Sequence, residues 1–188
     1  MNTRQKVVLD ACVLYSAVVR DILLNLAQRL LFDPHWSPII QDEWTRNLLK
    51  NRTDLDEKRI NRTVGFMSYF FPLANVTNFD HHIPNIELPD PDDRHVVACA
   101  IQCEAEIIVT FDLKDFPVEE LEKFGIIPQH PDDFICDLFE MNEKAAIEAL
   151  NVQLETLRKP RRTKEELLET FKKCDLAKAA ELFAQITE

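Results

Sequence analysis

Glycine is scarce in this sequence, since only Gly65 and Gly125 occur among its 188 residues. Loops that cradle nucleotide phosphates, such as the P-loop and the dinucleotide-binding turn, need several glycines at fixed spacing. The scarcity therefore excludes a nucleotide cofactor that is bound in this way.

Long apolar runs are also missing. Although 46% of the residues are hydrophobic, no run approaches the roughly 20 apolar residues that a helix needs to cross a bilayer. The opening residues MNTRQK lack the apolar stretch of a secretory signal. The five cysteines are scattered and odd in number, unlike the paired framework of a small secreted scaffold. We expect a cytoplasmic protein with reduced thiols and no membrane contact.

Positive charge is in short supply, and the formal net charge is −11. This balance argues against a protein that coats nucleic acid non-specifically through a basic face. The shortage is not uniform, however, because residues 46–62 hold 6 basic and 3 acidic side chains. A local positive patch can therefore coexist with an acidic centre.

Strand and helix patterns alternate along the chain. Short apolar runs predict strands at 6–9, 72–79, 106–112 and 126–129. Apolar residues at helical spacing predict helices at 13–31, 39–49, 55–71, 94–103 and 118–124, with a turn-rich link at 33–38 and a mainly helical chain beyond Asp132. Alternation of this kind indicates parallel crossover units. We expect a three-layer α/β/α domain with a small parallel sheet over 1–140, and a helical C-terminal extension over 141–188.

Two aspartates stand at the carboxyl ends of predicted strands, namely Asp10 and Asp112. A carboxylate in that position is costly to desolvate unless it is paired, coordinated or left at the mouth of a cleft. Ligands of open parallel sheets collect at this edge. We therefore expect the two side chains to face each other across a binding site.

Two further acids are predicted to join them. Asp93 shares a helix face with Val97, on the apolar side that packs against the sheet, whereas Asp92 points elsewhere. Glu43 aligns at helical spacing with Ile39 rather than with the solvated face. The sequence thus places four carboxylates at one edge of the sheet.

Each acid also has a purely structural explanation. Asp10, Asp93 and Asp112 could cap or begin the helix or turn that follows them, and Glu43 could be a solvated charge. The coincidence of acids at two strand ends and at an inward-facing helix start favours a shared site. Carboxylates that converge in a cleft repel one another, and the usual resolution is a raised pKa or a bound hard cation.

Oxygen ligands of this kind suit Mg²⁺ or Mn²⁺. One such cation, or a pair about 3.5–4 Å apart, can bind a phosphate, lower the pKa of a coordinated water and stabilise the leaving oxygen. The chemistry that this set of residues favours is hydrolysis of a phosphodiester bond.

In this order and spacing the acidic motifs resemble those of the PIN domain family, and within it the VapC-like toxins of bacterial toxin–antitoxin pairs. The motifs are VVLDACVLYSA, WSPIIQDEWTRNL, LPDPDDRHVVACAI and IIVTFDLKDFP, and the resemblance covers residues 6–129. It implies that the catalytic, metal-binding residues are Asp10, Glu43, Asp93 and Asp112, with Thr110 as the small polar residue of the last motif and Asp115 as an accessory acid. The basic patch of residues 46–62, which includes Arg46, is then expected to hold the substrate backbone.

The resemblance further implies a Mg²⁺- or Mn²⁺-dependent endoribonuclease that hydrolyses RNA phosphodiester bonds with a metal-activated water. It also implies a cognate antitoxin that blocks the cleft, and a homodimer. The extension beyond about Phe139 is longer than the minimal domain needs, so no function can be carried over to it.

Other functions stay open at this point. A related metal nuclease could act on DNA, as a flap or a single strand, and a catalytically silent member could only bind a partner. A phosphatase with Asp10 as nucleophile fits less well, because Cys12 stands where the second aspartate would act as acid and base. His95, close to Asp93, is better explained as an exposed or capping residue than as a substrate contact.

Overall fold

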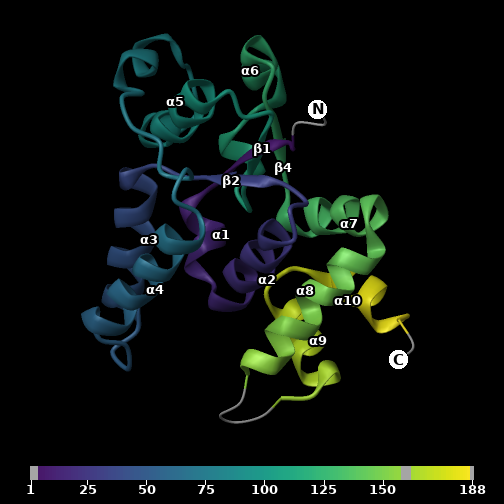
Figure 1. Cartoon of the computed structure of the whole chain (residues 1–188). Coiled ribbons are helices and arrows are strands. Elements are labelled where there is room, and N and C mark those ends of the chain that lie inside the picture. The colour runs from purple at the N-terminus through teal and green to yellow at the C-terminus, as the bar shows by residue number, and fades with distance from the viewer. Residues whose placement is uncertain (1–3, 158–161, 187–188) are drawn as a thin grey trace.

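The computed structural model describes residues 4–157 and 162–186. The described residues form a four-stranded parallel sheet in the order β2-β1-β3-β4. Its strands are β1 (Lys6–Leu9), β2 (Asp33–His35), β3 (Ile107–Val109) and β4 (Ile127–Gln129). Figure 1 shows helices on both sides of this sheet. The predicted three-layer α/β/α arrangement with a small parallel sheet and a helical C-terminal part is confirmed.

Ten α-helices lie within the described residues. They are α1 (Ala11–Tyr15), α2 (Ala17–Gln28), α3 (Pro38–Asn51), α4 (Glu57–Phe70), α5 (Arg94–Cys103), α6 (Val118–Leu121), α7 (Pro131–Met141), α8 (Glu143–Thr156), α9 (Lys164–Lys173) and α10 (Ala177–Ala184). A 3-10 turn over Pro91–Asp93 leads into α5, and another over Leu113–Asp115 follows β3.

The two central strands explain the apolar runs that the sequence displays. Every residue of β3 and all but the first of β1 are buried. Helix α5 packs against both of these strands, and α2 packs against β2. A parallel strand that is covered on both faces reads as a continuous run of valine, isoleucine and leucine. The first polar residues after such runs therefore emerge at the carboxyl edge of the sheet.

One predicted strand was wrong. Residues 72–79 run as a turn and extended chain, and a single bridge joins Asn75 to Trp36. The strand beside β1 is instead Asp33–His35, within the segment that we expected to be a turn-rich link. Pro34 misled the prediction, but a strand at the edge of a sheet tolerates a proline because one of its sides needs no ladder hydrogen bonds.

The long helix predicted at 13–31 was also wrong in detail. The helix is interrupted at Ser16, whose backbone is extended, and this interruption separates α1 from α2. Helix α1 therefore begins directly at the carboxyl end of β1 and stays short. The helices predicted at 39–49 and 55–71 are confirmed as α3 and α4.

Helix α3 has a firm start and a firm anchor. Ser37 accepts a 3.2 Å hydrogen bond from the backbone N–H of Ile40, with Pro38 in the first turn. Trp44 is buried, and the guanidinium of Arg20 lies 4.8 Å from the centroid of its ring. The anchor fixes the rotation of α3 and so decides where Glu43, the residue before Trp44, can point.

Of the C-terminal helices, α7, α8 and α9 pack against α2, and α10 packs against α7 and α9 (Figure 1). Gln153 on α8 donates a 2.9 Å hydrogen bond to the carbonyl of Val18 on α2. Both carboxylate oxygens of the buried Asp132 accept hydrogen bonds at the start of α10, from the backbone N–H groups of Lys178 (2.9 Å) and Ala179 (2.8 Å). Of the residues described, no helix has the length and apolarity needed to span a membrane.

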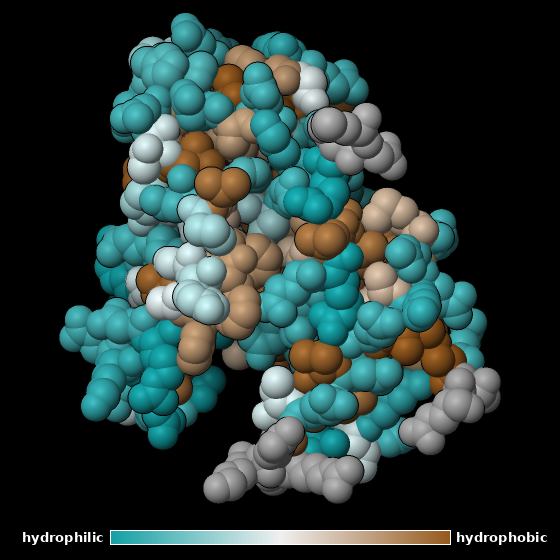
Figure 2. Space-filling model, viewed as in Figure 1, coloured by the Kyte–Doolittle hydropathy of each residue, from teal (hydrophilic) through white to brown (hydrophobic). Residues whose placement is uncertain are grey.

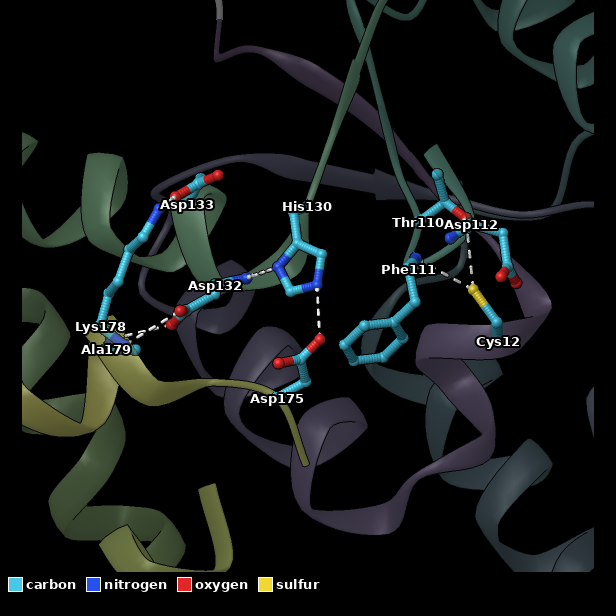
Figure 3. Close-up of polar contacts among 10 residues, drawn as sticks. All are labelled: Cys12, Thr110, Phe111, Asp112, His130, Asp132, Asp133, Asp175, Lys178 and Ala179. Atoms are coloured by element: carbon cyan, nitrogen blue, oxygen red, sulfur yellow. Dashed lines mark hydrogen bonds and ion pairs between the residues drawn. The ribbon is translucent and has the colours of Figure 1, made fainter. Parts of the chain in front are cut away.

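His130 joins this C-terminal part to the end of β4. Its Nδ1 accepts a 3.2 Å hydrogen bond from the backbone N–H of Asp132, and its Nε2 lies 3.3 Å from Oδ2 of Asp175. The imidazole ring also makes an edge contact with Phe111, at 5.1 Å between centroids (Figure 3). The basic segment RKPRRTK at 158–164 lies partly outside the described residues.

Candidate functional site

Asp10 lies at the junction of β1 and α1 and is almost fully buried, at 7% exposure. Its backbone N–H donates to the carbonyl of Val109 at the end of β3, which ties it to the neighbouring strand. Its Oδ1 accepts a 2.6 Å hydrogen bond from the N–H of Ala11, so Asp10 does cap α1. The capping bond uses one carboxylate oxygen and leaves Oδ2 for other partners.

Those partners are a hydroxyl and a thiol. Oδ2 of Asp10 accepts a 2.8 Å hydrogen bond from Oγ1 of Thr110 and a 3.1 Å bond from Sγ of Cys12. Sγ and Oγ1 also contact each other at 3.3 Å, and Sγ accepts a 3.3 Å bond from the N–H of Phe111 (Figure 3). Burial and the nearby charge of Asp10 raise the pKa of the Cys12 thiol, so the thiol keeps its proton and can donate.

Asp112 reaches Asp10 indirectly. Its side chain is exposed, and its backbone N–H donates a 3.1 Å hydrogen bond to the hydroxyl of Thr110, which in turn donates to Asp10. Figure 3 shows Asp112 beside Cys12 and Thr110 at the end of β3. Asp10 and Asp112 were predicted to face each other, and in the structure Thr110 connects them by hydrogen bonds to both. The role of Asp112 as a metal ligand stays a prediction.

Asp93 shows how close the acids are. It is half-buried at the start of α5. Burial raises the pKa of its carboxyl group to about 7, and repulsion from neighbouring carboxylates adds to the rise: Asp10, Asp90, Asp115 and Glu43. Carboxylates from β1, from α3, from the turn after β3 and from the start of α5 thus act on one group.

Glu43 belongs to the same cluster. Its side chain is half-buried, and burial raises its pKa, with a further rise from the charge of Asp10. Burial likewise raises the pKa of Asp10 itself, against the opposing effect of the hydrogen bonds that Asp10 accepts. We call Asp10, Glu43 and Asp93 the acidic cluster.

The two accessory residues lie at its margin. Asp115 is half-buried and close enough to repel Asp93, with Lys114 3.9 Å from its Oδ2. Arg46 is exposed one turn after Glu43, pairs with Asp42 at 3.1 Å, and acts to lower the pKa of Glu43. Asp115 thus lies close to Asp93, and Arg46 lies one turn along α3 from Glu43, while their roles toward a substrate stay predictions.

His95 was wrongly expected to be exposed. Its side chain is only 12% exposed, with Nε2 3.7 Å from Oε2 of Glu43. Burial lowers its pKa, which keeps the imidazole neutral, and its buried Nδ1 has no hydrogen-bond partner among the described residues. Position in the helix gave the signal, because His95 lies two residues after Asp93 and one turn before Cys99, which is fully buried.

Cys12 was missed as a member of the site. The signal for it was its place in the first turn of α1, where side chains lean back toward the helix start and hence toward Asp10.

The donor set suits a hard divalent cation, because it consists of carboxylate oxygens that repel one another in a partly desolvated setting. Nevertheless, within 4–157 and 162–186 no three histidine, cysteine, aspartate or glutamate side chains are gathered tightly enough to form a ready-made metal site. The acids are thus near neighbours with shared electrostatics and are not pre-assembled ligands.

Two family models match different parts of this chain. A family model described as "PIN domain" matches residues 6–114, and one described as "VapC50 C-terminal domain" matches 131–185. Over 53 residues the chain is 47% identical to a Mycobacterium tuberculosis protein named "Putative ribonuclease VapC50". That match covers 28% of this chain and 31% of the relative, and no solved structure matches.

The second match gives the C-terminal helices α7 to α10 a family context that the motifs alone did not supply. It begins at residue 131, ten residues before residue 141, where we placed the start of the C-terminal extension; that boundary stays a prediction. The first match spans more than half of the chain and contains three of the four acidic motifs whole. This chain belongs to the PIN domain family.

Proposed function

We propose that this chain is a divalent-metal-dependent endoribonuclease, the toxin of a VapC-type toxin–antitoxin pair. The observation that carries the proposal is the acidic cluster at the carboxyl edge of the sheet, in which the charge of Asp10 raises the pKa of both Glu43 and Asp93. Membership of the PIN domain family and similarity to a protein named as a ribonuclease support it.

The cation in this proposal is Mg²⁺ or Mn²⁺, held by Asp10, Glu43, Asp93 and Asp112. When bound, such a cation lowers the pKa of the attacking water and offsets the negative charge of the phosphate. The protein contributes orientation: Ala11, Cys12 and Thr110 hold the carboxylate of Asp10 by three hydrogen bonds. The position of Asp112 is fixed by the hydrogen bond that its backbone N–H donates to the hydroxyl of Thr110.

A row of cations beside the cluster supports an anionic chain as substrate. Helix α3 carries both Glu43 and Arg46, and exposed basic residues continue past its end into α4: Lys50, Arg52, Lys58, Arg59 and Arg62. Arg46 and Arg52 are paired with Asp42 and Asp54. A polyanion laid along α3 and α4 would reach the acidic cluster over basic side chains, which gain affinity by releasing counterions.

Exposed apolar side chains support a protein partner, which we propose to be an antitoxin or a second copy of the chain. Phe66, Tyr69, Phe70 and Leu73, in and after the last turn of α4, are each more than half exposed. Single apolar residues on a surface are ordinary, whereas neighbouring ones mark interaction sites. Figure 2 shows one face of the molecule as mainly hydrophilic with separate hydrophobic patches. Sedimentation of the purified chain with Tyr69→Glu as the comparison tests the dimer.

The test of the activity uses total cellular RNA with the purified chain, in Mg²⁺, in Mn²⁺ and in chelator, beside the Asp10→Asn variant. Discrete fragments that need the cation and are lost in the variant would support the proposal, and mapping their ends would identify the target. Single-stranded and flap DNA are offered in parallel, because cleavage of DNA alone would assign the site to the DNA-nuclease alternative. Intact nucleic acid throughout, from a folded chain, would favour a partner-binding role in the cytoplasm.

A further inference from the structure

We propose that Cys12 is a positioning residue of the acidic cluster, whose thiol holds the carboxylate of Asp10 in the orientation that a divalent cation needs. This inference rests on the proposed function and adds to it a residue of the first motif that is not one of its acids.

The thiol contacts each side of the junction between the first and last motifs. Sγ donates to Oδ2 of Asp10 at 3.1 Å, and accepts from the backbone N–H of Phe111 at 3.3 Å. It also lies 3.3 Å from the hydroxyl of Thr110. The start of α1 and the end of β3 are therefore joined through one sulfur atom, across 98 or more residues of sequence.

The geometry of these contacts indicates that Cys12 orients the carboxylate of Asp10. Oδ1 of Asp10 is held by Ala11 alone, whereas Oδ2 receives two donors, from Cys12 and Thr110. Two donors from different directions fix the rotation of a carboxylate about its terminal bond, which a single donor leaves free. The same sulfur takes up the N–H of Phe111 and so also fixes the backbone just before Asp112.

The contacts also argue against two other roles for this cysteine. A ligand to Mg²⁺ or Mn²⁺ should be a hard oxygen, and a thiolate is a soft donor. A nucleophile would need to be an accessible thiolate, whereas Sγ is engaged as a donor to a carboxylate at a part-buried position. The remaining role for Cys12 is to orient Asp10, the proposed metal ligand, by a hydrogen bond. Loss of a residue of this kind typically weakens metal affinity by about 10–100-fold.

The test compares three variants with the natural chain by titration calorimetry with Mn²⁺, and by RNA cleavage. Cys12→Ala removes the donor, whereas Cys12→Ser keeps a group that donates and accepts. Cys136→Ala is the matched control, because Cys136 is half-buried on α7, away from the cluster. We expect Cys12→Ala to bind Mn²⁺ at least about 10-fold more weakly, Cys12→Ser to recover most of the affinity, and Cys136→Ala to match the natural chain.

Two results would overturn the inference. One is Mn²⁺ affinity in folded Cys12→Ala equal to that of the natural chain. The other is a sulfur-to-metal charge-transfer band that appears when Co²⁺ is added to the natural chain and is absent from Cys12→Ser, because the chain has five free cysteines and only that difference would make the Cys12 sulfur a ligand. This second measurement does not use Cys12→Ala, so the inference can be overturned even if that variant does not fold.

The affinities also separate this inference from the proposed function. A natural chain that binds Mn²⁺ but leaves all RNA intact would contradict the nuclease, and the role of Cys12 would still be judged by the order of the three Mn²⁺ affinities. A natural chain that binds no Mn²⁺ would overturn both.

Discussion

The hydroxyl of Thr110 donates a 2.8 Å hydrogen bond to Oδ2 of Asp10, and it accepts a 3.1 Å bond from the backbone N–H of Asp112. Thr110 is completely buried. One hydroxyl thus connects two acids of the predicted site that are 102 residues apart in sequence.

Replacing that hydroxyl by a methyl group tests the connection at nearly constant volume. We expect Thr110→Val to reduce RNA cleavage by about 10–100-fold, as for other residues that orient metal ligands. It should also cost about 1–3 kcal/mol of unfolding free energy, because the N–H of Asp112 loses its acceptor in a part-buried place. Cleavage rates and urea unfolding measure the two effects. Thr110→Ser keeps the hydroxyl, and equal losses in both variants would show that the methyl group matters more.

Asp10→Asn is expected to separate activity from stability. Asparagine caps helices about as well as aspartate, so α1 keeps its first hydrogen bond. The substitution removes a charge that repels Asp93 and Glu43, which offsets the loss of the bonds that Oδ2 accepts from Thr110 and Cys12. The metal-free variant should therefore fold with a stability close to that of the natural chain while cleavage is abolished. Urea unfolding in chelator, read beside the cleavage assay, checks both halves. A large drop in stability would instead make Asp10 chiefly a structural residue.

The sequence was sufficient to predict those strands and helices whose formation is determined by their own pattern of apolar and capping residues. The buried strands around Val8 and Ile108 read as apolar runs, and α3 and α4 read as amphipathic helices with caps. The strand at Asp33–His35 could not be predicted from its own residues. It tolerates Pro34 because it pairs with β1 on one side only, and that pairing is a property of the whole sheet.

The features of the site also fall into two groups: those that local sequence patterns determine and those that tertiary contacts determine. Asp10, Asp93 and Glu43 could be foreseen as neighbours, because strand ends and helix faces set their positions. The partners of Asp10 could not, since they depend on how the ends of β1 and β3 meet in space. His95 and Cys12 have side chains that local patterns place on a helix, and only tertiary packing brings His95 against Glu43 and Cys12 against Phe111.

Asp93 predicts a pH dependence. Its pKa is raised from the usual 3.8 of an aspartate to about 7, chiefly by burial. Between these two values the folded state holds a proton that the unfolded state has lost, so the contribution of Asp93 to stability is present below about pH 4 and is lost as the pH rises through about 7. We expect the metal-free natural chain to lose more stability than Asp93→Asn over this window. Parallel slopes of unfolding free energy against pH in the two proteins would contradict the assignment.

The same proton competes with a cation. Mn²⁺ binding must displace it, so affinity should rise from about pH 6 to about pH 8 and should release protons. Calorimetry in two buffers of different ionisation enthalpy measures that release. If affinity proved constant over this range, Asp93 would not be a ligand.

Asp132 predicts how firmly the C-terminal helices are held. Its buried carboxylate accepts from the N–H groups of Lys178 and Ala179 at the start of α10, and so caps a helix 45 residues further along the chain. Loss of a cap costs about 0.5–2 kcal/mol, and we expect Asp132→Ala to fall at the upper end, since two donors lose their partner. Asp133→Ala is the control, because it removes only a surface ion pair with Lys178, worth about 1 kcal/mol at most. Hydrogen exchange should show faster opening of α10 in Asp132→Ala than in Asp133→Ala, with the sheet unchanged in both. If the whole chain opened equally faster, α10 would be part of one cooperative unit with the PIN domain, and the C-terminal helices would have no separate stability to lose.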